Sequence, residues 1–178
     1  MKEVKIFARA GQGAITTAAI LGEALFHEKK YAYAFPHFGA ARMGAPMNAF
    51  LRFDEKPIRS RCKIYHPDYI VVIDPTLIES EGAFNNLPQG AKAVVAVRET
   101  TKVPQVKGVE LYALPAEAIA QEVIGRPFAN TVLLGAFAKA SGEVSLDSVV
   151  KAVGKRFAAK PQVLEKNIQA VKKGYESV

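Results

Sequence analysis

The stretch that decides the fold is VKIFARAGQGAITTAAILGEALFHE, residues 4–28 of a chain of 178 residues. Val4, Ile6 and Ala8 recur at every second position, which is typical of a short strand, and a glycine turn ends the run. Residues 14–28 then carry apolar side chains at helical spacing and are apolar nearly all round. The stretch therefore predicts a strand, a tight turn and a buried helix, which together form a Rossmann-like first βα unit.

The rest of the chain continues with strands and ends with helices. Further strands are predicted at 31–35, 47–53, 58–64, 69–73, 93–97 and 109–113. Helices are predicted at 116–123 and 131–141, and two more follow Ser145 and Pro161. We expect an α/β fold over residues 1–178, a single three-layer domain with a mixed β-sheet flanked by helices.

Cysteine content excludes several kinds of site. Cys62 is the one cysteine, so the chain can form neither an internal disulfide nor a four-thiolate zinc site. An iron–sulfur cluster takes about four thiolates and is excluded as well. The three histidines share no metal-ligand spacing, so we expect no metal site. Any redox centre must be a bound organic cofactor or belong to another chain.

Hydropathy and charge limit the partners. No apolar run approaches the roughly 18 residues of a membrane span, and the start has no signal-peptide layout, so we expect a cytoplasmic protein without membrane contact. Lys and Arg number 24 against 17 Asp and Glu, a net charge of +7. Residues 151–178 hold seven basic and two acidic residues. A solvated helix face is the favoured interpretation and nucleic-acid binding the minor one.

The glycine turn is the first candidate site. Gly11 and Gly13 stand between a strand and a helix, where backbone N–H groups can bind an anion. The dinucleotide pattern G-x-G-x-x-G is incomplete, and neither a ribose-binding acid nor a P-loop lysine is present. Anion binding and a simple packed βα turn stand as equal alternatives.

The segment Phe35–Pro46 is the second candidate. It is too long and too apolar for a simple connection, and Arg42 could clamp a carboxylate or phosphate. His37, between two phenylalanines, is expected to be a packing or interface residue rather than a general base. Burial against another chain is a natural alternative for the whole segment.

Two further segments carry charge. In the predicted strand 58–64, Arg59, Arg61 and Lys63 would share one face, and a solvated edge strand is slightly favoured over a site for an acidic partner. Asp74 ends the apolar run 69–73, where open α/β sheets bind ligands, although Asp before Pro can also simply turn the chain.

Four ordered blocks resemble the gamma subunit of 2-oxoacid:ferredoxin oxidoreductases, in particular the pyruvate/2-ketoisovalerate branch. They are ARAGQGAITTAAILGEA (8–24), AFPHFGAARMGAPMNAFLRF (34–53), KPIRSRCKIYHPDYIVVIDPTLI (56–78) and NTVLLGAFAKASG (130–142). The equivalent region of the single-chain pyruvate:ferredoxin oxidoreductases is their domain III. The resemblance is dense over residues 4–79 and loose over 85–128.

The resemblance implies a subunit that is inactive alone. The family oxidatively decarboxylates a 2-oxoacid to acyl-CoA and passes electrons to ferredoxin. It implies alpha, beta and delta partner subunits that hold thiamine diphosphate, Mg and 4Fe–4S clusters, with coenzyme A as co-substrate and no cofactor held by this chain alone. The gamma subunit is expected to cover the active site and to help bind coenzyme A.

The resemblance also implies site residues, none of them catalytic. Those matched to cofactor binding are Arg9, Gly11, Gln12, Gly13, Arg42 and Asn130. Those matched to an interface or active-site cover are Phe35, Pro36, His37, Phe38, Gly39, Gly44, Ala45 and Pro46. The chain departs from the family at Ala8 and Ala10, where glycine is usual, and at Met43, where a basic residue is usual; both alanines are expected to keep ordinary backbone angles. The alternative function is an autonomous nucleotide-binding module that uses the Gly11–Gly13 turn.

Overall fold

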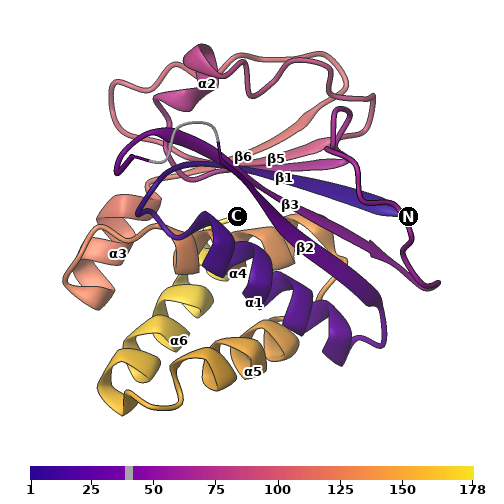
Figure 1. Ribbon diagram of the computed structural model, residues 1–178. Coiled ribbons are helices and arrows are strands. Elements are labelled where there is room, and N and C mark those ends of the chain that lie inside the picture. Colours follow the sequence, from indigo (N-terminus) through magenta and orange to yellow (C-terminus); the bar gives the residue numbers. More distant parts are fainter. Residues whose placement is uncertain (39–41) are drawn as a thin grey trace.

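A mixed sheet of six strands organises the computed structural model, which describes residues 1–38 and 42–178 (Figure 1). The strands are β1 (Lys2–Arg9), β2 (Tyr31–Phe38), β3 (Pro46–Asp54), β4 (Tyr69–Val72), β5 (Lys92–Ala96) and β6 (Glu110–Leu114). Their order across the sheet is β2-β3-β1-β4-β5-β6. Strands β1, β4, β5 and β6 run parallel, whereas β3 is antiparallel to both β1 and β2.

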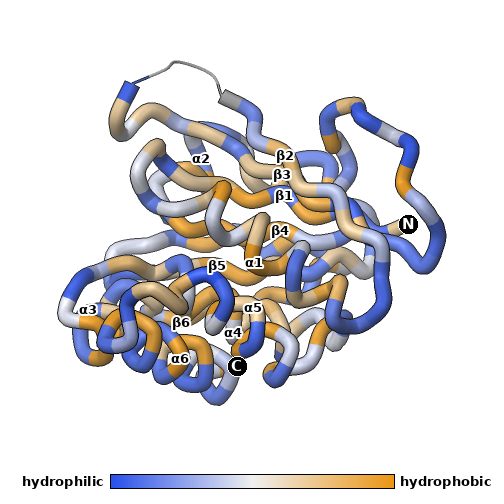
Figure 2. The backbone as a smooth tube through the Cα atoms, turned by 60° about the horizontal axis from the view of Figure 1, so that its bottom comes forward, coloured by the Kyte–Doolittle hydropathy of each residue, from blue (hydrophilic) through white to orange (hydrophobic). Residues whose placement is uncertain are grey.

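Strand β1 lies in the interior of the sheet, as its apolar pattern predicts. Val4 is opposite Leu51 of β3 on one side and Tyr69 of β4 on the other. The side chains of Val4, Ile6 and Ala8 are fully buried against the helices. The middle strands β4 and β5 are hydrophobic along their length (Figure 2), as expected of strands covered on both faces.

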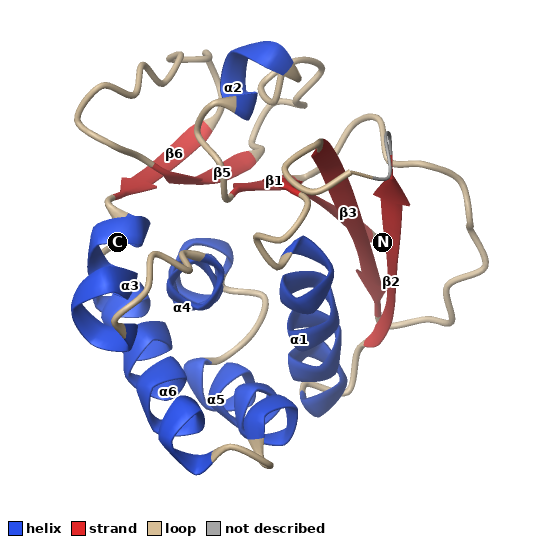
Figure 3. Cartoon of the chain, turned by 60° about the vertical axis from the view of Figure 1, so that its left-hand side comes forward, coloured by secondary structure: helices blue, strands red, loops and turns tan. Residues whose placement is uncertain are grey.

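The helices are distributed unequally over the two faces. Their bounds are α1 (Ala14–His27), α2 (Leu77–Ser80), α3 (Ala116–Ile124), α4 (Asn130–Ser141), α5 (Leu146–Phe157) and α6 (Pro161–Glu176). Five of them pack together on one face, while the short α2 and irregular segments cover the other (Figures 1 and 3). The predicted α/β fold, a mixed sheet flanked by helices, is confirmed.

The helical layer is centred on α4, which crosses α6 at very close range. Its residues are buried almost without interruption, because α4 lies between the sheet and α6. A Cβ atom at Gly135 would overlap the backbone carbonyl of Val171, and one at Gly174 would overlap the carbonyl of Val132. Two glycines that face opposite helices therefore allow this approach.

The strand predicted at 58–64 is wrong. Residues 55–68 run as an irregular segment without strand pairing. The buried Arg52 donates hydrogen bonds to the carbonyl oxygens of Cys62 (2.7 Å) and Lys63 (3.4 Å), which a neighbouring strand would otherwise use. Arg61 stacks over the Tyr33 ring at 4.1 Å, so the alternating cations do not share a solvated strand face.

The limits of the second strand also differ from prediction. The strand predicted at 31–35 is longer than expected, because β2 continues through Pro36 to Phe38, and Pro46 already belongs to β3. Because β2 is the outer strand of the sheet, the missing N–H of Pro36 is tolerated there. The connection between β2 and β3 is therefore shorter than the segment Phe35–Pro46 that the sequence indicates.

Candidate functional site

The glycine turn connects the end of β1 to the start of α1 at the edge of the sheet where the parallel strands end. Gly11 (φ 102°) and Gly13 (φ 86°) both have left-handed backbone angles, which favour glycine. Ala8 and Ala10 keep negative φ, as predicted for alanine in this turn. Gly13 directly precedes α1, and no side chain caps the helix. The first N–H groups of α1 therefore stay open toward a ligand.

Four side chains, which we call the Asp74 cluster (Arg9, Gln12, Asp74 and Thr76), fix this turn from behind. Gln12 donates from Nε2 to Asp74 Oδ2 (2.7 Å), and its Oε1 accepts from the Arg9 backbone N–H (2.7 Å). Thr76 donates to Asp74 Oδ1 through both its backbone N–H (2.9 Å) and its hydroxyl (2.6 Å). Arg9 Nε lies 3.4 Å from Asp74 Oδ2.

The charge of Asp74 is stabilised inside this cluster. Burial alone would raise the pKa of its carboxyl group. Hydrogen bonds from Thr76 and Gln12 and the nearby Arg9 guanidinium outweigh that effect, and the pKa lies below its ordinary value. Asp74 is thus an ionised, buried acceptor at neutral pH.

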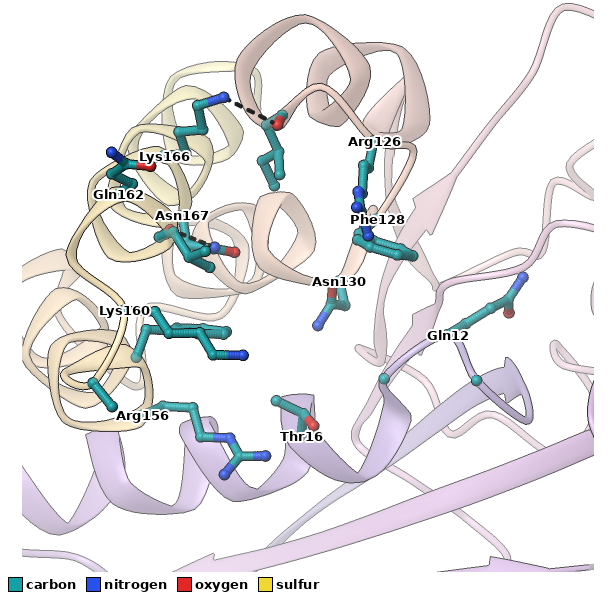
Figure 4. Close-up of a pocket in the computed structure, with 16 residues that line it drawn as sticks. Gln12, Thr16, Arg126, Phe128, Asn130, Arg156, Lys160, Gln162, Lys166 and Asn167 are labelled. Carbon is teal, nitrogen blue, oxygen red and sulfur yellow. Dashed lines mark hydrogen bonds between the residues drawn. The ribbon is translucent and has the colours of Figure 1, made fainter.

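A cavity of about 790 Å³ opens in front of the turn (Figure 4). Its wall includes Gly11, Gln12, Gly13 and Asn130, four of the six residues predicted for cofactor binding. The opposite wall comes from the α3–α4 connection and from the segment that joins α5 to α6. The volume lies in the range of about 300–1,000 Å³ that small-molecule and cofactor sites occupy.

Cations dominate the charged groups of this cavity. Arg126, Arg156, Lys160 and Lys166 line it, and no carboxylate is among the described lining residues. In Figure 4 the side chains of Arg156 and Lys160 extend into the space between α1 and α6. None of the four cations has a carboxylate partner within salt-bridge distance in the described part of the chain. The cavity is therefore electropositive.

Three helices begin at the same cavity. Gly13 before α1, Asn130 of α4 and Lys160 before α6 all line it, and no acidic residue occupies the first turn of any of the three helices. Helix N-termini carry partial positive charge and free N–H groups, which favour anions. The arrangement suits a ligand with several negative charges.

The two other residues predicted for cofactor binding lie elsewhere. Arg9 is beside the cavity but bonds to Thr76 Oγ1 (2.8 Å) and to the Gly44 carbonyl (3.1 Å). Arg42 is exposed and is not among the described residues that line the cavity. The Met43 sulfur lies beside the turn, because a Cβ atom added at Gly11 would be 2.8 Å from it.

The predicted interface segment divides between the two faces of β2. The rings of Phe35 and His37 lie 5.1 Å and 6.1 Å from that of Phe50, on the face that the 55–68 segment partly covers. Pro36 is exposed on the other face. Gly44 and Ala45 bond to Ala10 through backbone groups (3.0 and 2.9 Å), and Pro46 starts β3. Phe38 ends β2, and Gly39 lies outside the described residues.

Sequence reasoning missed the cationic wall. Residues 151–178 were interpreted as a solvated helix face, and part of their charge is indeed paired at the surface, in Lys155–Glu23 (2.7 Å) and Lys173–Glu122 (3.0 Å). The cations that line the cavity include Arg156 and Lys160, four residues apart across the end of α5. Their approach to a turn near residue 12 is a property of the fold that no local pattern reveals.

Other kinds of site are not found in the described residues. No group of three His, Cys, Asp or Glu side chains there could hold a metal ion. Cys62 is exposed and unbridged. None of the described helices combines the length and the hydropathy that crossing a bilayer requires.

Comparison with known proteins identifies the family. Residues 3–177 match the family model described as pyruvate ferredoxin/flavodoxin oxidoreductase. Over 178 residues, all of this chain and 96% of the relative, 42% are identical to pyruvate synthase subunit PorC of Methanothermobacter thermautotrophicus. The pyruvate/ketoisovalerate oxidoreductases common subunit gamma of Thermococcus litoralis is 41% identical over 180 residues (99% of this chain, 96% of the relative).

A solved structure agrees with both relatives. The crystal structure of pyruvate oxidoreductase subunit PORC from Thermotoga maritima matches with a TM-score of 0.83 and 34% identity, covering 98% of this chain and 95% of that one. The predicted resemblance to gamma subunits is confirmed, and the alternative of an autonomous nucleotide-binding module finds no support. The chain therefore belongs to the pyruvate ferredoxin/flavodoxin oxidoreductase family, as a chain of the gamma-subunit type.

Proposed function

We propose that the chain, as one gamma-type domain over residues 1–178, works inside a complex that converts a 2-oxoacid and coenzyme A to acyl-CoA and reduces ferredoxin. Full-length similarity to a pyruvate synthase subunit and to a pyruvate/ketoisovalerate oxidoreductases subunit supports this reaction. Thiamine diphosphate, Mg and 4Fe–4S clusters would be held by alpha, beta and delta partners. The single cysteine is consistent with clusters carried by other chains.

The electropositive cavity is the observation that supports a role in binding coenzyme A. That co-substrate carries a diphosphate and a ribose phosphate, so several negative charges must be matched along its nucleotide end. The open N–H groups of the Gly11–Gly13 turn, the Asn130 side chain and the four cations offer donors of that kind. Phe128, exposed at the cavity wall, offers an aromatic surface for the adenine ring.

The segment around residues 35–46 would cover the active site of the complex. Its described end is joined to the glycine turn by hydrogen bonds between Ala10 and residues 44–45. Met43, a large apolar side chain at this end, is 86% exposed. We infer that this end of the segment, together with Phe35 and Pro36 of β2, contacts a partner subunit.

Purification from the source cell tests the subunit assignment. A tagged chain should recover thiamine-dependent and cluster-bearing partners, and the recovered complex should reduce ferredoxin with a 2-oxoacid and coenzyme A. The purified chain alone should show no such activity. An active isolated chain, or recovery without a thiamine enzyme, would contradict the assignment.

Paired lysine variants of the complex test the coenzyme A site. Lys160→Ala removes a cavity cation, and Lys151→Ala removes an exposed α5 cation that does not line the cavity. A charged hydrogen bond contributes about 1.5–3 kcal/mol, so K160A should raise the KM for coenzyme A about tenfold or more. K151A should leave that KM within about twofold, because exposed charges contribute little. Equal effects of the two variants would exclude the cavity as the site.

A further inference from the structure

Asp74 lies behind the Gly11–Gly13 turn, which lines the cavity, and beside Arg9, which bonds to Gly44 in the neighbouring segment 42–46. Its side chain is only 5% exposed, although a buried carboxylate is costly unless fully paired. Both oxygens are engaged, Oδ1 by two donors of Thr76 and Oδ2 by Gln12 and Arg9. Asp74 does not line the cavity, so the carboxylate acts on the site only through these neighbours.

Gln12 links Asp74 to the glycine turn by hydrogen bonds. Its amide oxygen accepts the Arg9 backbone N–H and its amide nitrogen donates to Asp74, each at 2.7 Å. Figure 4 shows the Gln12 amide directed away from the cavity, although the residue belongs to the cavity wall. The polar end of Gln12 is therefore an anchor, and the turn presents its backbone to a ligand.

Arg9 links Asp74 to residues 42–46. The Arg9 guanidinium contacts Thr76 Oγ1 and Asp74 on one side and donates from Nη1 to the Gly44 carbonyl (3.1 Å) on the other. Gly44 and Ala45 bond in turn to Ala10. The Gly11–Gly13 turn and residues 44–45 are thus both held, through Gln12 and Arg9, by the buried carboxylate of Asp74.

We propose that Asp74 is a positioning residue for coenzyme A: through Gln12 it orients the Gly11–Gly13 turn, which lines the cavity, and through Arg9 it ties residues 42–46 to the back of that turn. The inference rests on the proposed coenzyme A site. It assigns to Asp74 an effect on affinity for coenzyme A and not on the chemical steps, since it touches no described cavity surface.

The Asp74→Asn variant of the complete complex tests this role. An amide at 74 has one acceptor oxygen, so either Thr76 or Gln12 would face an N–H₂ group. Gln12 cannot turn over in compensation, because the Arg9 N–H needs its oxygen. We expect the KM for coenzyme A to rise about tenfold, because one hydrogen-bond donor of the Asp74 cluster would be left without an acceptor. The kcat at saturating coenzyme A and the KM for the 2-oxoacid should change less than about twofold, since positioning acts on binding.

A reversed pair separates positioning from general damage. Gln12→Glu alone would place two carboxylates against each other and should also raise the KM for coenzyme A. In the double variant D74N/Q12E, the amide of residue 74 donates to the carboxylate of residue 12, which still accepts the Arg9 N–H. The double variant should therefore recover most of the lost affinity, as coupled neighbours do. A double variant no better than the worse single one overturns the proposal.

Two further comparisons make every outcome informative. If D74N does not assemble, Thr76→Val perturbs the same cluster without removing the carboxylate, and an unchanged KM for coenzyme A in T76V overturns the proposal. An increase of the 2-oxoacid KM as large as that for coenzyme A also overturns it. If K160A raises the KM for coenzyme A and D74N does not, only the positioning role fails. If neither variant changes it, the coenzyme A site itself fails.

Discussion

Gly13 lines the cavity and has a backbone conformation that favours glycine. Its φ of 86° is strained for any residue with a Cβ, and that Cβ would lie 2.8 Å from the Asn130 amide nitrogen. A side chain there would therefore change the backbone of the turn and displace Asn130 from its place at the start of α4. Both effects act on groups that line the cavity.

The Gly13→Ala variant should lose affinity for coenzyme A as well as stability. Its matched control is Gly142→Ala, because Gly142 has a similar φ (66°) at the end of α4 and open space around it. The left-handed φ should cost each variant about 1–2 kcal/mol in the free energy of unfolding, and G13A should lose more because the added Cβ also displaces Asn130. Only G13A should raise the KM for coenzyme A in the complex. If G142A raises that KM as much, Gly13 has no special relation to the site.

Individual residues show which parts of the candidate site can be predicted from local sequence. Gly11, Gly13 and Asn130 belong to recognisable local patterns, and the structure brings them together. Arg9 and Gln12 are also predicted to bind a ligand; in the structure the Gln12 amide bonds to Asp74 and to the Arg9 backbone N–H, and the Arg9 guanidinium bonds to Thr76 and Gly44. Which way a polar side chain turns depends on partners distant in the chain, here Asp74, and local spacing carries no information on that choice.

The contact between α4 and α6 determines how the helical layer is assembled. Gly135 and Gly174 let the two backbones approach until each glycine meets the carbonyl of the other helix. Helices that pack so closely leave no room even for a methyl group. The placement of α6, and with it one wall of the cavity, depends on this crossing.

The Gly135→Ala variant should unfold at markedly lower denaturant concentration than the unmodified chain. The added methyl group forces α4 and α6 apart, and overpacking of this kind costs about 3 kcal/mol. Gly154→Ala is the matched control, since Gly154 lies within α5 with nothing within 4 Å of an added Cβ. It should stabilise the chain by about 0.5–1 kcal/mol, because alanine is the better helix former. A G135A variant as stable as G154A would contradict the close crossing.

Glu28 joins α1 to α5 and gives this contact a pH dependence. It accepts hydrogen bonds from the backbone N–H (3.0 Å) and hydroxyl (2.6 Å) of Ser145, the residue that caps α5. The side-chain and backbone hydrogen bonds from Ser145 lower the pKa of Glu28 from about 4.5 to about 2. A carboxylate whose pKa is lower in the folded chain than in the unfolded chain stabilises the fold at pH values above the unfolded pKa. That stabilisation is lost as the pH falls through the folded pKa.

The Glu28→Gln variant should therefore differ most from the unmodified chain at neutral pH. The difference in unfolding free energy between the two should be constant above pH 4.5 and shrink as the pH falls from 4.5 toward 2. Urea denaturation of both chains at several pH values measures it. A difference that grows toward low pH would show that the carboxylate is not the stabilising form.

Elements differ in how well local sequence predicts them. The buried helix α1 and the strands of the parallel half follow from their own apolar patterns. The alternation at 58–64 failed because Arg52 takes up the backbone oxygens that strand pairing would need. Helix α2 has only four residues and two buried side chains, too short for a periodic pattern.

At the scale of the whole molecule, the sheet edge formed by β2 carries no charged side chains. Strand β2 (YAYAFPHF) contains no Lys, Arg, Asp or Glu, and Ala32, Ala34 and Pro36 are exposed on it. Outer strands usually carry charges that discourage pairing with further strands. We expect the purified chain, without its complex, to self-associate at this edge.

The Ala34→Lys variant should raise the concentration at which the isolated chain begins to scatter light. Its control is Ala158→Lys, which adds the same charge at an exposed position at the end of α5. Net charge rises equally in both, so a benefit of A34K alone would assign the effect to the edge. Equal behaviour of the two variants would mean that general charge, and not β2, limits solubility.

The cavity is built from three parts of the chain that are far apart in sequence, residues 11–16, 124–130 and 156–167. During synthesis the glycine turn leaves the ribosome long before the segment that completes its opposite wall. Contacts between such distant parts of a chain form late in folding, because closing long loops is costly in entropy. A nascent or truncated chain would thus carry the turn without a binding site, and the capacity to bind the ligand would report that the last helix has docked.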